Sequence, residues 1–198
     1  MPGAPLFRRQ LLAAPADNEP ARAPVLGGMV WRPSLRSRHG VYFVTCRAWA
    51  AASKASDLRA MRAFKAAPAP EIVERIAEEI ALMGAALSGG MARSVVPIAC
   101  GHSRRPDCLS AQLAGAVAAR LGVELVGVFA GRFCSGSSHP KENTKLPPLE
   151  IRRLPDGPAL VVDDIATSGW HMHEALTALR ARGVPALGIA WVGGIKAG

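Results

Sequence analysis

The spacing of hydrophobic positions changes along this chain, and the changes predict its helices and strands. Apolar residues recur at helical intervals in residues 72–87 with glutamates between them, and a Ser-Gly-Gly sequence follows, so we predict an amphipathic helix that ends there. Residues 56–65 predict a shorter helix, which a Pro-Ala-Pro sequence terminates. A short β-like run in residues 41–46 predicts a strand.

From residue 94 onward, strands and helices alternate. We predict strands at residues 94–100, 123–129, 158–162 and 185–192, and helices at residues 107–121 and 168–182. Continuous apolar runs are typical of strands that are buried on both faces. The pattern therefore predicts an α/β fold, a parallel sheet with helices on both faces. Right-handed crossovers bring the carboxyl ends of its strands to one edge, where such sheets bind ligands.

Two segments do not follow this alternation. Residues 1–27 carry five prolines and little periodicity, so we predict that residues 1–40 form a basic, proline-rich irregular arm. The α/β domain then comprises residues 41–198, with its core in residues 71–198. The polar segment 131–148 is rich in Ser, Pro and Lys and is too long for a plain connection.

The positive charge is concentrated in the first third of the chain. The net charge is +9, and residues 1–70 contain eleven basic but only three acidic residues. The basic side chains of this region predict contacts with phosphates, nucleic acid or an acidic partner. They include Arg8, Arg9, Arg22, Arg32, Arg36, Arg38 and Arg47. A solvated, partly disordered arm is the competing interpretation, and a transit peptide stays open.

Composition excludes several classes of protein. Apolar residues make up 49% of the chain and aromatic residues 5%, which argues against a disordered chain and against an aromatic-rich binding module. The longest stretches without a charged residue, 80–92 and 183–195, are shorter than the roughly 18 residues that cross a bilayer. The four cysteines form no C-x-x-C pair, so we expect free thiols in a reducing compartment.

Residues 160–169, Leu-Val-Val-Asp-Asp-Ile-Ala-Thr-Ser-Gly, contain the sharpest chemical pattern. Small residues let backbone N–H groups approach a ligand, and a helix N-terminus adds partial positive charge, so residues 166–169 predict an anion-binding turn. The preceding carboxylates, Asp163 and Asp164, suit hydroxyl groups or the waters of a metal ion. A ribose 5-phosphate combines both features, and we expect these carboxylates to face a polar crevice.

Two other interpretations explain less of this pattern. Paired aspartates also follow the first strand of receiver domains, where roughly a hundred residues come afterwards, but fewer than 35 follow Gly169. A helix that is merely capped by Thr167 or Ser168 accounts for the hydroxyl groups and leaves the two carboxylates unexplained.

The same residues resemble the phosphoribosyl pyrophosphate (PRPP) motif of type I phosphoribosyltransferases. The resemblance implies that Asp163 and Asp164 hold the ribose hydroxyls and that the turn binds the 5-phosphate. The turn residues are Ala166, Thr167, Ser168 and Gly169. The family usually has a larger aliphatic residue at the position of Ala166 and a small hydroxyl residue at the position of His171, which is here a candidate phosphate donor.

The loop after residue 98 supports the resemblance. It carries four potential phosphate donors, His102, Ser103, Arg104 and Arg105. In the family this loop binds pyrophosphate, which implies bidentate contacts from the two arginines. Two surface arginines ahead of a helix are the alternative.

Three other segments match the family loosely. Residues 57–65 and the helix after them resemble the ComF-like, competence-associated branch, whose usual four-cysteine zinc module is missing here. The resemblance implies a hood from residues 41–70. It also implies a lid at residues 131–148, where Lys141 and Lys145 suit pyrophosphate; an ordinary loop would have a similar composition.

The resulting hypothesis is a cytoplasmic, Mg²⁺-dependent phosphoribosyltransferase, a pentosyltransferase of nucleotide metabolism. It transfers phosphoribosyl from PRPP to a nitrogenous base and releases pyrophosphate. The candidate catalytic residues are Asp163, Asp164, Arg104 and Arg105, and the aspartates reach Mg²⁺ through water or ribose hydroxyls. The expected partners are PRPP, a nucleobase-like acceptor, a second copy in a homodimer, and nucleic acid or an acidic partner at the arm, with no membrane.

A non-catalytic protein of the ComF-like type is the alternative hypothesis. It would sense PRPP or a nucleotide, or act as an accessory in DNA uptake or processing, and the basic first third of the chain favours it. A phosphohydrolase that acts on sugar phosphates ranks third, because the sequence shows neither a nucleophile nor a metal cluster for it.

Overall fold

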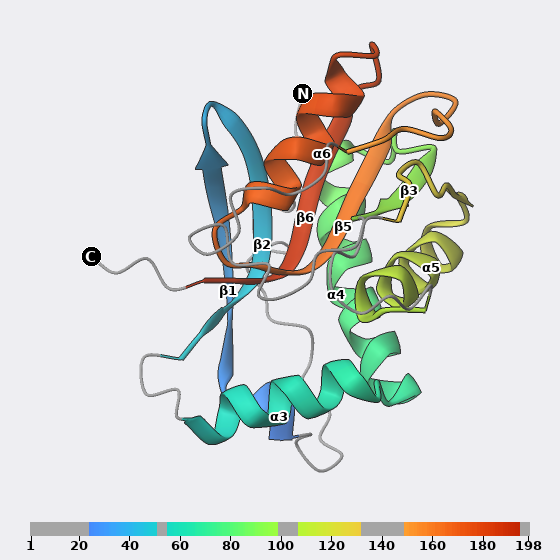
Figure 1. The fold of residues 1–198 in the computed structure, drawn as a ribbon. Coiled ribbons are helices and arrows are strands. Elements are labelled where there is room, and N and C mark those ends of the chain that lie inside the picture. Colours follow the sequence, from blue (N-terminus) through green and yellow to red (C-terminus); the bar gives the residue numbers. More distant parts are fainter. Residues whose placement is uncertain (1–23, 51–54, 99–106, 132–148, 195–198) are drawn as a thin grey trace, which may run out of the picture.

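A six-stranded open sheet forms the centre of the molecule (Figure 1). The structure is a computed structural model, and it describes residues 24–50, 55–98, 107–131 and 149–194. The strands lie in the order β1-β2-β6-β5-β3-β4, and only β1 and β2 pair in an antiparallel manner. Their bounds are β1 Met29–Arg38, β2 Val41–Trp49, β3 Ser94–Pro97, β4 Glu124–Leu125, β5 Ala159–Ala166 and β6 Ala186–Gly193.

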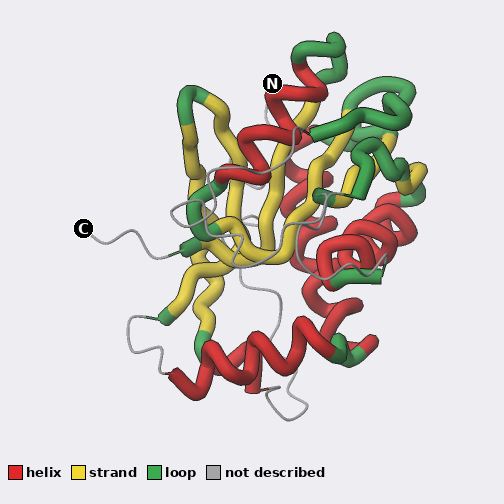
Figure 2. Tube along the Cα trace, in the orientation of Figure 1, coloured by secondary structure: helices red, strands yellow, loops and turns green. Residues whose placement is uncertain are grey.

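Helices cover both faces of the sheet, as predicted. The helices are α2 Pro24–Gly27, α3 Ala55–Ala66, α4 Pro70–Ser88, α5 Leu109–Leu121 and α6 Trp170–Arg180. α4 and α5 pack on one face, and α6 lies on the other (Figures 1 and 2). The mostly parallel α/β fold expected from the apolar runs is therefore confirmed.

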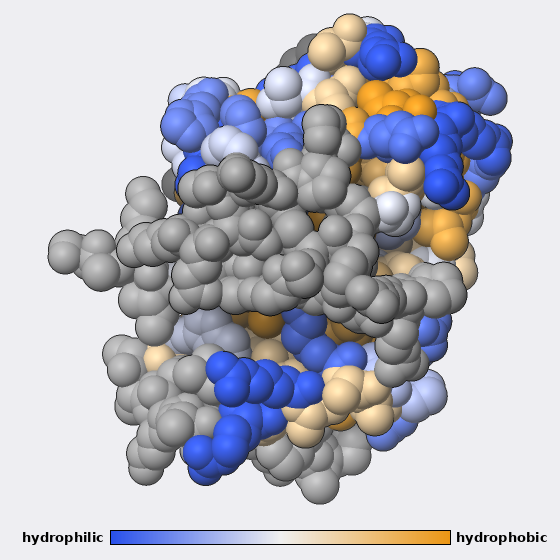
Figure 3. Space-filling model, viewed as in Figure 1, coloured by the Kyte–Doolittle hydropathy of each residue, from blue (hydrophilic) through white to orange (hydrophobic). Residues whose placement is uncertain are grey.

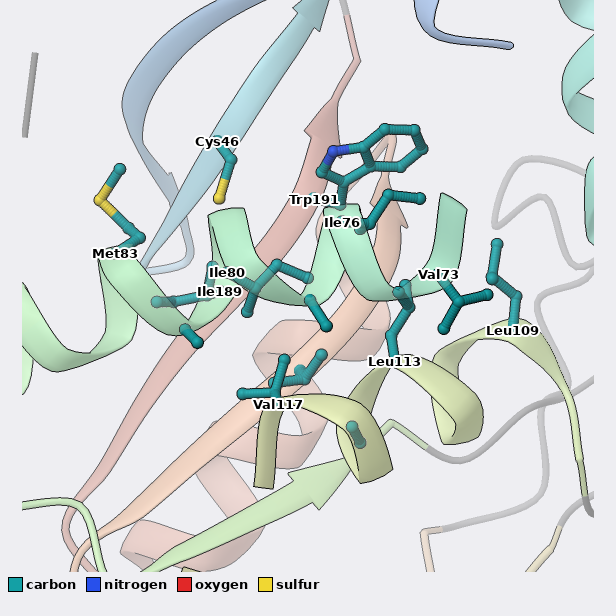
Figure 4. Close-up of a cluster of buried hydrophobic side chains, with 14 of the residues drawn as sticks. Cys46, Val73, Ile76, Ile80, Met83, Leu109, Leu113, Val117, Ile189 and Trp191 are labelled. Carbon is teal, nitrogen blue, oxygen red and sulfur yellow. The ribbon is translucent and has the colours of Figure 1, made fainter. Parts of the chain in front are cut away.

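Each face of the sheet has its own hydrophobic core. On the α4 side, Ile76 and Ile80 of α4 meet Leu113 and Val117 of α5 and Trp191 of β6 (Figure 4). On the α6 side, buried residues of α6 pack against buried residues of β2, β5 and β6. The α6 residues include Met172, Leu176 and Leu179, and the strand residues include Phe43, Val161 and Ala190. Because both faces of β5 and β6 are buried, residues 159–162 of β5 and 186–193 of β6 are continuously apolar, as in other parallel sheets.

The described end of the predicted arm is part of this sheet. Residues 29–38 form strand β1, which pairs with β2 through a two-residue turn at His39 and Gly40. Both turn residues have positive φ, 46° and 76°, which matches the right-handed twist of a hairpin. Pro33 lies where the register shifts, between Trp31 and Ser34, and an edge strand tolerates a proline at such a bulge. The expectation of an irregular arm is therefore wrong for residues 29–38, and residues 1–23 lie outside the described residues.

Two other sequence expectations also change. The predicted hood segment, residues 41–70, is divided, because β2 pairs with β6 inside the main sheet whereas α3 is a separate helix. The predicted strand at residues 123–129 is shortened to Glu124–Leu125. After it, the N–H of Val126 still donates to the carbonyl of Val95 at 2.9 Å, and Phe129 then forms an antiparallel bridge with Ile151.

A buried polar cluster joins β2, α4 and β6. Arg47 donates two hydrogen bonds to Glu79, from Nε to Oε2 at 2.8 Å and from Nη2 to Oε1 at 2.6 Å. Trp191 Nε1 donates to the same Oε2 at 2.9 Å, and Glu79 is only 1% exposed. Arg47 was among the basic residues expected to contact phosphates, nucleic acid or an acidic partner. That expectation is wrong for Arg47, because it pairs with Glu79 of the same chain.

Two of the cysteines lie in the described residues, and both are free thiols. Cys46 is buried and Cys108 is half-buried, whereas Cys100 and Cys134 lie outside the described residues. Burial, and then the charge of Glu79, raise the pKa of the Cys46 thiol, so this thiol stays neutral. Within the described ranges, no helix has the length and apolar character needed to cross a membrane.

Candidate functional site

The two adjacent aspartates lie near the carboxyl end of β5, which has a parallel strand on each side. Asp163 is aligned with Ala190 of β6. The carbonyl of Val162, just before the pair, accepts hydrogen bonds from Ile98 N at 3.0 Å and Ser110 Oγ at 3.2 Å. Neighbouring elements thus fix the backbone that carries both carboxylates.

Both carboxylates are enclosed, so the expected polar crevice is not an open one. Asp163 is 6% exposed and Asp164 is 7% exposed. The strand continues through them to Ala166. Asp163 Oδ1 accepts the N–H of Asp164 at 2.9 Å, and Asp164 Oδ1 accepts the N–H of Ile165 at 2.7 Å.

Lys65 of α3 reaches this carboxylate pair. Its Nζ lies 2.6 Å from Asp164 Oδ2, while its side chain is 43% exposed. α3 buries Met61 and Phe64 and exposes Arg59 and Arg62, and hydrophilic side chains follow this helix on the surface in Figure 3. The sequence placed Lys65 in the predicted hood but gave it no role, because nothing local links residues 99 positions apart.

The carboxylates differ in their electrostatic environment. Burial, followed by the negative charge of Asp164, raises the pKa of Asp163 well above its ordinary value, while Lys65 opposes the rise. Burial thus makes Asp163 harder to ionise than an exposed aspartic acid, while the ammonium group of Lys65 lies beside Asp164.

Hydrogen bonds hold both ends of the turn from β5 into α6. The N–H of Gly194 binds the carbonyl of Ala166 at 3.1 Å, and Ser168 Oγ accepts the N–H of Trp170 at 3.4 Å. Thr167 is exposed and Ser168 half-exposed. The turn ends at the N-terminus of α6, where backbone donors and the helix dipole favour an anion. His171 lies half-buried in the first turn of this helix.

Gly169 gives the turn its shape, because its φ is +69° and an added Cβ would lie 2.6 Å from Phe43 Cζ. We expect Gly169→Ala to lower the free energy of unfolding by roughly 2–4 kcal/mol, through left-handed strain and overpacking. Urea unfolding of the variant measures this loss. Gly131→Ala is the control, since its Cβ would meet nothing within 4 Å. Equal losses of unfolding free energy in both variants would contradict the role of Gly169 in shaping the turn.

The hairpin places residues at this turn that the sequence assigned only to a basic arm. Arg38 Nη1 donates to the carbonyl of Ser168 at 3.1 Å, and Arg36 Nη2 donates to that of Gly194 at 2.6 Å. The Arg38 guanidinium also lies 4.7 Å from the centre of the Trp170 ring. The His-Gly sequence between two β-like segments was a signal for the hairpin itself, but it does not indicate that the hairpin reaches this turn.

Several predicted site residues lie outside the described residues. These are the pyrophosphate-loop candidates His102, Ser103, Arg104 and Arg105 and the lid candidates Lys141 and Lys145. The described part of β3 ends at Pro97, which is aligned with Val162. Within the described ranges, no group of three or more His, Cys, Asp or Glu residues is arranged to hold a metal ion.

Comparison with known proteins finds similarity at the level of structure. No family model and no curated protein matches this chain. Orotate phosphoribosyltransferase from Aeropyrum pernix is similar, with 19% identity, a TM-score of 0.38, and coverage of 84% of this chain and 75% of that chain. Hypoxanthine phosphoribosyl transferase of Trypanosoma cruzi shows 16% identity and a TM-score of 0.40, over 64% of this chain and 75% of its own. Both similarities are distant, so the case for function rests on the residues of the site.

Proposed function

We propose that this protein is a phosphoribosyltransferase that uses PRPP and Mg²⁺ and transfers the phosphoribosyl group to a nitrogenous base. One observation carries the proposal: the acidic pair Asp163-Asp164 of an inner parallel strand leads directly into a tight turn at the N-terminus of α6. Ligands of such sheets bind at the carboxyl ends of the strands. Carboxylates beside a phosphate-binding turn match a ribose 5-phosphate.

The proposed chemistry breaks the bond between C1 of the ribose and pyrophosphate while a nitrogen atom of the base bonds to C1. Positive charge develops on the ribose ring and negative charge on the leaving group, so positioning and electrostatics supply most of the catalysis. Asp163 and Asp164 orient the ring through its hydroxyls, and the turn holds the 5-phosphate. From the sequence, we assign His102, Ser103, Arg104 and Arg105 to the pyrophosphate.

The carboxylate pair fits a magnesium ion that arrives with the substrate. Mg²⁺ is usually held by one or two carboxylates together with substrate phosphates rather than by a closed protein cage. Asp163 and Asp164 are such a donor pair, and they reach the ion through water or the ribose hydroxyls. When bound, Mg²⁺ neutralises charge on the pyrophosphate as it leaves.

Lys65 Nζ lies 2.6 Å from Asp164 Oδ2, and a carboxylate has acceptor positions left for a ribose hydroxyl beside such a contact. Lys65 can also move away from Asp164 at a small cost in free energy, since a partly exposed ion pair contributes about 1 kcal/mol or less. We infer that Lys65 holds the side chain of Asp164 in place until the substrate binds.

The test is release of pyrophosphate from PRPP and Mg²⁺ across a panel of purine, pyrimidine and other nitrogenous bases. We expect release above background with at least one base, and none when Mg²⁺ is removed with a chelator. Tight PRPP binding without release for any base would overturn the transferase and favour a PRPP-sensing protein. The absence of PRPP binding would remove the ribose assignment altogether.

A further inference from the structure

Two arginines of β1 bind the backbone on both sides of the proposed phosphate turn. Arg38 Nη1 donates to the carbonyl of Ser168 at 3.1 Å, inside the turn. Arg36 Nη2 donates to the carbonyl of Gly194 at 2.6 Å, and the N–H of Gly194 in turn binds the carbonyl of Ala166 at 3.1 Å. The turn is therefore held at its first residue through Arg36 and near its last residue by Arg38.

These contacts also fix the direction of the turn's donors. In a planar trans peptide, the C=O of one residue and the N–H of the next point in opposite directions. The bond from Arg38 to Ser168 O therefore turns the N–H of Gly169 away from the guanidinium. The bond from Gly194 to Ala166 O orients the N–H of Thr167 in the same manner. Both are donors that a phosphate at this turn would use.

The hairpin is anchored to α6 by aromatic contacts as well. The Arg38 guanidinium lies 4.7 Å from the centre of the Trp170 ring, and His173 Nδ1 lies 3.2 Å from the backbone carbonyl of Arg38. The ring of His39 is edge-on to Trp170 at 6.1 Å and to His173 at 5.4 Å. Arg38 is therefore held in place from both sides, which limits the rotamers that it can adopt.

The two guanidinium groups carry charge that the described residues do not neutralise. Within the described ranges, neither Arg36 nor Arg38 is paired with a carboxylate, and the Nε of each is buried without a hydrogen-bond partner. The hydroxyl of Thr45, a fully buried residue on the neighbouring strand, also lacks a partner. An added Cβ at Gly193 would lie 2.8 Å from both this hydroxyl and Arg36 Nη2. Unneutralised positive charge thus gathers beside the turn, on the side of β1.

We propose that Arg36 and Arg38 are positioning residues for a phosphate monoester at the turn of residues 166–169. They hold the turn's carbonyls so that its N–H groups face the ligand, and their positive charge favours an anion at the turn. The inference rests on the proposed function and adds the β1–β2 hairpin to the phosphate site.

The test compares Arg38→Ala and Arg36→Ala with Arg32→Ala, which removes an exposed arginine of the same strand. Two probes are titrated by calorimetry: ribose 5-phosphate, which needs the turn, and inorganic pyrophosphate with Mg²⁺, which does not. We expect Arg38→Ala and Arg36→Ala to weaken ribose 5-phosphate binding about 10- to 100-fold, as is typical of a lost hydrogen bond to a charged group. Arg32→Ala should leave it within about twofold, and none of the variants should alter pyrophosphate binding. Added guanidinium ion should restore part of the ribose 5-phosphate affinity of Arg38→Ala.

The outcomes separate this inference from the proposed function. If the parent protein binds both probes and Arg38→Ala behaves like Arg32→Ala, the positioning role is wrong and the transferase stands. If Arg38→Ala loses both probes equally and guanidinium ion restores neither, the arginine is merely structural, which also overturns the inference. If the parent protein binds neither probe, both the proposed function and this inference are wrong.

Discussion

Replacing Asp163 and Asp164 together with asparagine is expected to lower kcat/KM for pyrophosphate release by roughly 10²- to 10⁴-fold. Each carboxylate is assigned one charge-assisted hydrogen bond to a ribose hydroxyl, and such bonds contribute about 1.5–3 kcal/mol each. Asparagine retains an oxygen that accepts the N–H bonds of Asp164 and Ile165, so the strand keeps its local contacts. The measurement is the rate of pyrophosphate release at several PRPP concentrations.

The fold of this double variant is expected to survive. The pKa of Asp163 is higher in the folded chain, so its contribution to stability is fully present at low pH and is lost as the pH rises toward the folded-state pKa. Asparagine removes that loss at neutral pH. Asp156→Asn, the same change at an exposed position, is the control. A double variant that stays folded and retains the parent's rate would disprove the ribose assignment.

The largest expected change in stability follows from Glu79→Gln. This substitution removes the carboxylate that Arg47 binds twice and leaves the guanidinium group buried at 8% exposure. Breaking a buried ion pair in this way costs about 3–5 kcal/mol. In a chain of this size that lowers the midpoint of thermal unfolding by roughly 6–20 °C. Urea and thermal unfolding followed by circular dichroism measure the two quantities.

Glu74→Gln is the matched control, because Glu74 pairs with Arg120 at 2.9 Å on an exposed surface. An exposed pair contributes about 1 kcal/mol or less. The double variant Arg47→Met with Glu79→Leu should recover most of the lost stability, since buried pairs are replaced well by apolar residues of similar volume. Recovery stays incomplete because Trp191 Nε1 then lacks its acceptor. Equal effects of Glu79→Gln and Glu74→Gln would show that the buried cluster is not a special source of stability.

Part of the candidate site was readable from the chain because it is local in sequence. Residues 163–169 are contiguous. An acidic pair before a small-residue turn therefore predicts the same local site wherever its strand lies in the sheet. Lys65 and Arg38 were not readable, because they meet Asp164 and Ser168 across 99 and 130 positions. Which lysine or arginine reaches a site depends on strand order and on helix placement, and charge counts do not encode either.

The sequence by itself determined the alternation of strands and helices, the Ser-Gly-Gly sequence at which α4 ends, and the acidic pair followed by its turn. These features follow from local periodicity and backbone preferences, which act over a few residues. Only the tertiary structure decided that β1 is a sheet strand, that Arg47 faces Glu79, and that the two aspartates are enclosed. The physical reason is that pairing, burial and charge compensation depend on which distant segments pack together, and that choice belongs to the whole core rather than to any one segment.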